Sequence, residues 1–412
     1  MGGQQFLEGR ALLDTTHLHR VLRFDPDRGT IEVEAGIQWP ELLRWLLERQ
    51  KDPEHTWTFA QKQTGANRFS LGGALGSNIH SRGLAMKPLI SDIESFTLLD
   101  GAGRLRRCSR TENADLFGLA IGGYGLFGVV YSTTLKLVPR RKLQRVVEMV
   151  NLSDVVSGFE GRIRDGFLYG DFQFAIDPAS EEFLRRGIFS CYRPVPMATP
   201  ILPRKRLSTR VWLDLVHGAH VQPTRAFDEY ARYYQTTSGH IYWSDLHQFS
   251  GYIDNFHERI DQRTRAEHPA SEIITEIYVP RARLIDFMEE ARRCFRRRSV
   301  RVIYGTIRLI ERDNESFLAW ARERYACVIF NLHTVRTADG IERSAAAFRE
   351  LIDLAAERNG RYYLTYHRFA SKQQLERCYP EFSEFLRLKR KFDPQEVFQS
   401  DWYRHYREQN RA

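Results

Sequence analysis

The chain has 412 residues, which suits two domains or one large domain with a substantial insertion. Its composition of 42% hydrophobic, 12% aromatic and 27% charged residues excludes a disordered or fibrous protein. The net charge of +9 comes mostly from arginines that are dispersed along the chain without a nucleic-acid-binding motif, so we interpret them as a solvated surface and expect no nucleic-acid partner.

Cysteine spacing and hydropathy narrow the class further. The five cysteines are odd in number and widely spaced, which argues against a disulfide framework and a zinc site, and we predict no metal site. No run of about 18 apolar residues is present, and the N-terminus lacks the apolar core of a signal peptide. We therefore expect a cytoplasmic protein without a membrane span.

The first 140 residues predict short strands and helices. A strand is expected between Gly29 and Gly36, where Ile31 and Val33 alternate with polar residues. The next helix begins near Pro40 and has an apolar stripe formed by Leu42, Leu43, Leu46 and Leu47. Further predicted elements are a hairpin with strands at 93–100 and 104–109, and a helix, a glycine turn and a long strand within 115–139.

From about residue 140 onward, aromatic and arginine-bearing segments alternate with helical ones. The predicted strands are 273–280, 301–310, 327–335 and 361–367. The predicted helices are 281–298 and 341–358, the second closed by Asn359 and Gly360 as a C-terminal cap. This order of elements predicts a sheet with helices covering one face.

The strongest local signal is a glycine-rich segment from Thr64 to Gly83. Its glycines and small polar residues allow backbone amides to approach a phosphate or a flat ring closely. The spacing matches neither a Walker nor a Rossmann motif, and a second glycine cluster at 122–128 precedes a strand rather than a helix. Taken alone, the segment is compatible with a cofactor site and with a structural loop.

Four segments together resemble flavoproteins of the vanillyl-alcohol oxidase type, which have a PCMH-type FAD-binding domain. They are Leu12–Leu47, SLGGALGSNIHSRG at Ser70–Gly83, IGGYGLFGVV at Ile121–Val130, and KFDPQEVFQSDWYRHY at Lys391–Tyr406. The nearest subgroups are the aldonolactone and alditol oxidases and the oxidoreductases that act on decaprenyl-phosphoryl ribose. The resemblance implies an α+β fold. In it, a PCMH-type FAD-binding domain (1–140 and 376–412) would carry an inserted substrate-cap domain (141–375) of antiparallel sheet covered by helices.

The resemblance also implies contacts with FAD. Gly72 and Gly73 would let the backbone pack against the cofactor, and His80 would lie near the flavin, although Ser81 replaces the glycine that usually follows this histidine. A histidine satisfied inside a structural loop is the alternative for His80. The other implied contacts are Gly65, Ser70, Ser77 and Asn78 along the ribityl chain and pyrophosphate, Gly125, Gly128 and Val129 at the adenosine end, and Tyr363 at the flavin.

The start of the chain departs from the family pattern. Family members wrap the pyrophosphate with a loop of the form G-G-R-H-S-M-G-G-Q, whose histidine is in many members bonded to the flavin. Here the first four residues match only the end of that loop, so we expect truncation within it and an FAD-binding domain incomplete at its N-terminus. Gly2, Gly3 and Gln4 are still expected to contact FAD, which would bind non-covalently, and uncovered apolar surface predicts poor solubility.

Strand parity selects candidate substrate-side residues. Tyr304, Thr306 and Arg308 share one face of the strand at 301–310, and Asn331 and His333 project together from the strand at 327–335. The resemblance implies that Arg308 and His333 are catalytic, although Thr306 replaces the glutamate of the family's E-x-R motif. Where relatives carry an active-site lysine, this sequence offers Tyr366 and His367.

The implied reaction is hydride transfer to flavin N5 from a carbon that bears a hydroxyl group. His367 or His333 would accept the hydroxyl proton, because neutral imidazole titrates near working pH, and Arg308 would stabilise developing negative charge. We therefore predict an FAD-dependent oxidoreductase that acts on a sugar, alditol or aldonolactone, with its electron acceptor left open. The alternatives are an oxidase of a lipid-linked sugar phosphate, and a truncated, flavin-free remnant without activity.

Overall fold

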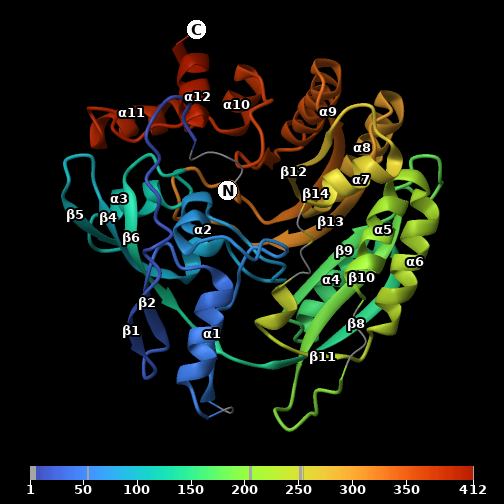
Figure 1. Ribbon diagram of the computed structural model, residues 1–412, viewed down its shortest axis with the longest axis horizontal. Coiled ribbons are helices and arrows are strands. Elements are labelled where there is room, and N and C mark those ends of the chain that lie inside the picture. The colour runs from blue at the N-terminus through green and yellow to red at the C-terminus, as the bar shows by residue number, and fades with distance from the viewer. Residues whose placement is uncertain (1–5, 53–54, 204–206, 250–252, 254, 412) are drawn as a thin grey trace.

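The computed structural model describes residues 6–52, 55–203, 207–249, 253 and 255–411 (Figure 1). Their strands form a five-stranded antiparallel sheet in the order β1-β2-β6-β4-β5 and an eight-stranded antiparallel sheet in the order β11-β8-β10-β9-β13-β14-β12-β15. A short pair joins β3 (Trp57–Thr58) to β7 (Val138–Pro139). The mixture of antiparallel sheets and helices confirms the predicted α+β class.

The five-stranded sheet is built from the first third of the chain. Its strands are β1 (Val21–Asp25), β2 (Thr30–Glu34), β4 (Ile93–Leu99), β5 (Leu105–Ser109) and β6 (Val129–Lys136). Its helices are α1 (Trp39–Arg49), α2 (Leu71–Ser77) and α3 (Ala114–Ala120). Ile31 and Val33 are buried as the alternation predicts, and three of the four stripe leucines of α1 are buried as well. The fourth, Leu47, is exposed, because it lies at the edge of the apolar stripe.

The eight-stranded sheet uses most of the remaining chain. Its strands are β8 (Lys142–Asn151), β9 (Tyr169–Phe174), β10 (Arg186–Val195), β11 (Ile241–Trp243), β12 (Ala270–Pro280), β13 (Val302–Ile310), β14 (Tyr325–Val335) and β15 (Arg361–Tyr362). Three of the four predicted strands are therefore confirmed at close to full length. The fourth, predicted over 361–367, ends at Tyr362, and Trp402 donates its indole hydrogen to the carbonyl of Leu364 beyond that end.

Helices lie on both faces of this sheet rather than on one. One face is covered by α4 (Val155–Arg164), α8 (Leu284–Arg298) and α9 (Ala338–Ala356), with Phe159 packed on Phe189 and Phe295 on Phe330. The other face is partly covered by α5 (Thr209–Val221), α6 (Pro223–Thr236) and α7 (Phe256–Thr264). Ile188, an apolar residue of that face, is buried in a cluster that includes Phe227 and Ala231 of α6, so the second cover shields apolar side chains of the sheet.

The C-terminal helices return to the beginning of the fold (Figure 1). They are α10 (Lys372–Cys378), α11 (Phe382–Phe392) and α12 (Asp401–Arg411). Phe385 packs on Phe127 with ring centroids 5.3 Å apart, and Trp402 packs on Tyr124 at 4.5 Å. The two-domain division at residues 140 and 376 remains a prediction. Within the described residues, every helix is too short or too polar to cross a bilayer.

Candidate functional site

A cavity of about 860 Å³ lies between the eight-stranded sheet, helices α5 and α6, and the loop at Thr64 and Gly65. Its volume falls within the roughly 300–1,000 Å³ that is typical of small-molecule sites. Its lining combines aromatic rings, including Trp212, Tyr230, Tyr234 and Tyr304, with charged side chains: Arg82, Arg145, Asp171 and Arg308. Such a lining can pack against a sugar ring and also form hydrogen bonds with its hydroxyl groups.

The strand register brings polar side chains onto the face that lines the cavity. Arg308 lies opposite Cys327, and Cys327 lies opposite Tyr278. Tyr304 lies opposite Asn331 in the same way. Because directly paired residues of an antiparallel sheet share a face, side chains from β12, β13 and β14 gather on one side. The predicted grouping of Tyr304, Thr306 and Arg308 on one face is confirmed by this register.

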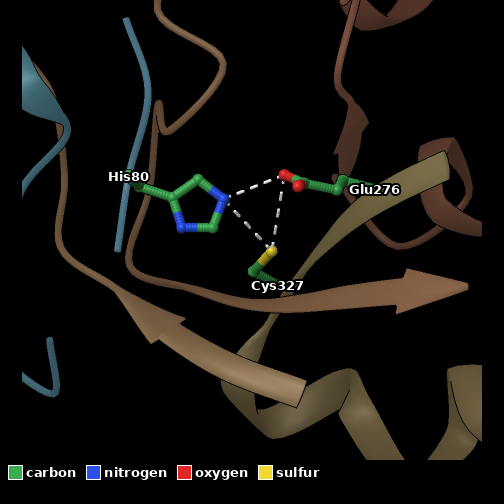
Figure 2. Close-up of side chains that lie close together, drawn as sticks. All are labelled: His80, Glu276 and Cys327. Carbon is green, nitrogen blue, oxygen red and sulfur yellow. Dashed lines mark hydrogen bonds and ion pairs between the residues drawn. The ribbon is translucent and has the colours of Figure 1, made fainter. Parts of the chain in front are cut away.

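Glu276 is the centre of a buried hydrogen-bond cluster on this face (Figure 2). Its Oε2 lies 2.9 Å from His80 Nε2 and accepts a hydrogen bond of 2.8 Å from the Tyr278 hydroxyl, and its Oε1 accepts one of 2.9 Å from Tyr366. Cys327 Sγ lies 3.9 Å from Oε2. Burial by itself would raise the pKa of Glu276, but the adjacent His80 and these donors outweigh it and hold the pKa below the ordinary value.

His80 occupies the space between the glycine-rich segment and the sheet. Its Nδ1 lies 2.9 Å from the carbonyl oxygen of Ser81, so both ring nitrogens face acceptors. The ring also packs on Trp320 with centroids 5.1 Å apart, and its side chain is fully buried. The replacement of glycine by Ser81 therefore coincides with a histidine that is tied to Glu276, 196 residues away in the chain.

Several polar atoms at the cavity have no hydrogen-bond partner among the described residues. They are Nε and Nη1 of Arg308, Nε of Arg82, Oγ1 of Thr64, Oδ1 of Asp171 and Oδ1 of Asn331. Unpaired buried donors and acceptors are costly, so their concentration in one cavity indicates a polar ligand. Arg308 is only 4% exposed, and its unpaired guanidinium nitrogens could donate hydrogen bonds to an anionic oxygen or to the polar edge of a ring in the ligand.

Lys62 is a buried cation that the sequence did not reveal. Its ammonium group donates to the carbonyl oxygens of Gln63 at 2.8 Å and Gln248 at 3.1 Å. Burial, and then the positive charges of Arg82 and Arg308, lower the pKa of Lys62 to about 7. No local motif surrounds Lys62, so only the fold could bring it close to two arginines of the cavity.

The glycine-rich segment forms α2 and the turns on either side of it. Ser70 caps α2 by accepting a hydrogen bond from the Gly73 amide at 3.2 Å, and the Gly72 amide donates to the Ala35 carbonyl at 2.7 Å. A side chain at Gly72 would meet the Ala35 backbone oxygen at 3.1 Å, so the close packing favours glycine there.

Asn78 ends α2 with a left-handed backbone, and its side-chain amide is used within the protein. Its Nδ2 donates to Asp313 at 3.0 Å and its Oδ1 accepts from the Ile90 amide at 3.0 Å. The Ser77 carbonyl likewise accepts a hydrogen bond of 2.6 Å from Tyr363, whose ring is fully buried. The polar groups of Ser77, Asn78 and Tyr363, which were predicted to contact the cofactor, thus form hydrogen bonds with other residues of the protein.

The second glycine cluster contains two different kinds of glycine. Gly125 has a φ of +74° and open space where a side chain would lie, whereas Gly128 has a φ of +150° and packs so closely on Leu98 that a Cβ would lie 2.5 Å from it. Val129, half-buried, begins β6. The predicted contacts Gly2, Gly3 and Gln4 lie outside the described residues.

Two predicted catalytic histidines lie away from the cluster around Glu276. His333 lies six residues beyond Cys327 on β14, about 20 Å along the strand at about 3.3 Å per residue. His367 is stacked on Phe348 at 4.5 Å and lies 3.0 Å from Thr275 Oγ1, on the face opposite Glu276. Burial lowers the pKa of His367 to about 3. Arg308 and Tyr366, in contrast, are brought to the Glu276 side of the sheet.

The residues present fit a bound FAD. Unpartnered donors and acceptors at Thr64 and Arg308 suit the polar edge of a flavin ring, and Gly65, with a φ of +90°, leaves the adjacent backbone without a side chain. Gly125 offers similar bare backbone in the second glycine cluster. Such backbone lets a cofactor approach closely.

Comparison with known proteins agrees with this chemistry. Residues 1–109 match the FAD binding domain family, and residues 203–406 match the D-arabinono-1,4-lactone oxidase family. L-gulono-1,4-lactone dehydrogenase of Mycobacterium tuberculosis is 23% identical over 95% of this chain and 85% of its own length. L-gulonolactone oxidase of Bos taurus is 29% identical over 36% of this chain and 32% of its own length.

Cytokinin dehydrogenase 5 of Arabidopsis thaliana is a third relative, 22% identical over 64% of this chain and 49% of its own length. Several of these alignments are partial, and the chain spans about a third of the length of some of the curated relatives it matches. The two family matches nevertheless occur in the order that the four sequence segments predict. The chain therefore carries a PCMH-type FAD-binding domain, followed by a segment that matches the D-arabinono-1,4-lactone oxidase family.

Proposed function

We propose that this protein is an FAD-dependent oxidoreductase that oxidises a CH–OH group of an aldonolactone or a related sugar or alditol. The observation that carries the proposal is the cavity beside Thr64 and Gly65, in which buried polar atoms and aromatic rings lie together. The names of the gulonolactone relatives support a lactone as the first substrate to test.

The side chains of the cavity have distinct parts in the proposal. Tyr304 and Trp212 would pack on the substrate ring, while Asp171 and Asn331 would accept hydrogen bonds from its hydroxyl groups. Arg308 would stabilise negative charge that develops on the substrate oxygen or the cofactor ring. FAD, when bound, supplies the acceptor for the hydride.

The Glu276 cluster positions this machinery rather than contacting the substrate. Its ionised carboxylate balances the buried charge of Arg308 and orients Tyr366 through a hydrogen bond of 2.9 Å. Of the predicted catalytic residues, the proposal retains Arg308 as the charged group and Tyr366 as a positioning residue. His333 and His367 have no part in it, because neither lines the cavity.

One observation favours the alternative of a substrate with an apolar tail. The cavity continues beneath α5 and α6, where Leu215, Val216, Ala219 and Phe227 line it. A free lactone has no apolar group to fill that space, whereas a lipid-linked sugar phosphate has one, and its phosphate would suit Arg145 or Arg82. Testing such a substrate beside free lactones distinguishes the two classes.

The first experiment is a visible absorption spectrum of the purified protein, before and after acid precipitation. Flavin bands that leave with the acid supernatant would support non-covalent FAD, and a protein that stays colourless with added FAD would refute the proposal. The yellow protein is then mixed anaerobically with L-gulono-1,4-lactone, an alditol and a prenyl-phosphate sugar, and bleaching of the flavin band identifies the substrate class.

A matched pair of variants tests Arg308. We expect Arg308→Gln to lower kcat by about 10² to 10³, the usual loss for one electrostatic stabiliser. Arg312→Gln, an exposed arginine four residues later, should leave kcat unchanged. Equal activity of the two variants at saturating FAD would show that Arg308 does not act on the reacting atoms.

A further inference from the structure

A second group of ionisable side chains lies at the far end of the cavity-lining face. Glu272 on β12 lies directly opposite His333 on β14, and α5 and α7 bring His220 and His257 to the same carboxylate. Glu272 Oε1 lies 2.9 Å from His220 Nε2 and 3.5 Å from His333 Nδ1, and Oε2 lies 2.9 Å from His257 Nδ1. Three imidazoles from three elements therefore converge on one carboxylate.

The orientation of the His220 ring defines what its inner nitrogen can do. Nδ1 lies 2.8 Å from the carbonyl oxygen of Val216, which only accepts, so Nδ1 carries a hydrogen. In the neutral ring, Nε2 then presents a lone pair to the carboxylate of Glu272, and a positive charge is needed between these two acceptors. Either a proton on Nε2 or a bound metal ion can supply that charge, and a ring nitrogen held by a backbone carbonyl is a common support of a metal-binding histidine.

The donor atoms are close enough and buried enough to hold an ion. The ligand atoms of His220, Glu272 and His333 all lie within 4.8 Å of one another. Their side chains are 2%, 4% and 11% exposed. Ligand atoms of a tetrahedral zinc site lie roughly 3.4 Å apart for metal–ligand distances of about 2.1 Å, so small side-chain rotations would complete the site.

We propose that His220, Glu272 and His333 form a site for a divalent transition-metal ion, while His257 holds the second carboxylate oxygen of Glu272. Imidazole and carboxylate donors suit Zn²⁺, which we take as the first candidate. The ion would join α5 to β12 and β14, and so hold a helix that covers the cavity. The site is separate from the Glu276 cluster, because Glu276 lies four residues further along β12 than Glu272.

The test measures metal rather than activity, so it does not depend on the proposed reaction. Untagged, FAD-loaded protein is dialysed against a chelator and titrated with ZnCl2 in competition with a zinc-binding dye, and metal content is measured by plasma mass spectrometry. We expect one Zn²⁺ per chain. Glu272→Gln and His220→Gln should weaken binding by at least about tenfold to a hundredfold. His217→Gln, three residues earlier on α5 and outside the cluster, is the matched control.

X-ray absorption at the zinc edge of the unmodified protein supplies a readout that no variant can confound by misfolding. Imidazole and oxygen ligands without sulfur would support the site. Sulfur ligands, no zinc bound after dialysis against micromolar ZnCl2, or wild-type affinity in Glu272→Gln and His220→Gln would overturn it. In those cases the cluster is a network of histidines hydrogen-bonded to Glu272. Far-UV circular dichroism confirms that each variant is folded, and His333→Asn replaces any variant that is not.

Discussion

The Glu276 cluster permits a quantitative test of how the glycine-rich segment, through His80, is held to the eight-stranded sheet, through Glu276. Glu276→Gln preserves the shape of the side chain and removes its charge, while His80, Tyr278 and Tyr366 remain in place. Each hydrogen bond to a charged group contributes about 1.5–3 kcal/mol, but the amide can keep part of this bonding. Removing one member of a buried charged pair costs about 3–5 kcal/mol, so we expect a loss near 4 kcal/mol in the free energy of unfolding.

Urea unfolding followed by far-UV circular dichroism, at saturating FAD, measures this loss. Glu94→Gln is the control, because its ion pair with Arg28 is exposed and should contribute less than about 1 kcal/mol. We also expect His80→Gln and Glu276→Gln to be non-additive by about 2 kcal/mol, since either change alone leaves a buried partner unpaired. A Glu276→Gln loss no larger than that of Glu94→Gln, or additive single losses, would refute the coupling.

The remaining predictions concern three separate positions. Because the folded-state pKa of Lys62 is lowered from 10.5 to about 7, the unfolded chain binds one more proton between those values, so the free energy of unfolding falls as pH drops through this window and levels off below pH 7. The fall is at most about 5 kcal/mol, and Lys62→Met should abolish it in urea midpoints measured from pH 7 to 10. His367→Phe should keep kcat within about twofold, because the ring is stacked on Phe348 away from the cavity; a loss like that of Arg308→Gln would return His367 to the reaction. Gly305→Ala should destabilise the fold by about 1–3 kcal/mol in thermal unfolding, because its Cβ would lie 2.1 Å from Phe174; an unchanged midpoint would contradict that packing.

Local pattern was sufficient for much of the fold. The two-residue period of a strand identified which of Tyr304, Thr306 and Arg308 share a face, and the register with β14 confirms it. Four short segments were sufficient to indicate an FAD-binding domain through their resemblance to a known family, and the family match over residues 1–109 confirms it. These inferences depend on residues that are near one another in the chain.

The membership of the site depended on contacts between distant parts of the chain. His80 meets Glu276 across 196 residues, and no local signal marks Glu276 or the buried Lys62. His333 shares a face with Cys327 but lies about 20 Å along the strand, and the end of β15 at Tyr362 places Tyr366 and His367 on opposite sides of the sheet.

The sequence by itself therefore determined most of the elements and the faces of the strands, since these follow from local periodicity, and it indicated the cofactor class through resemblance to a known family. Only the tertiary structure decided which charged groups share a cavity. Burial, pairing and pKa depend on neighbours supplied by other strands and helices, as the three histidines gathered around Glu272 illustrate.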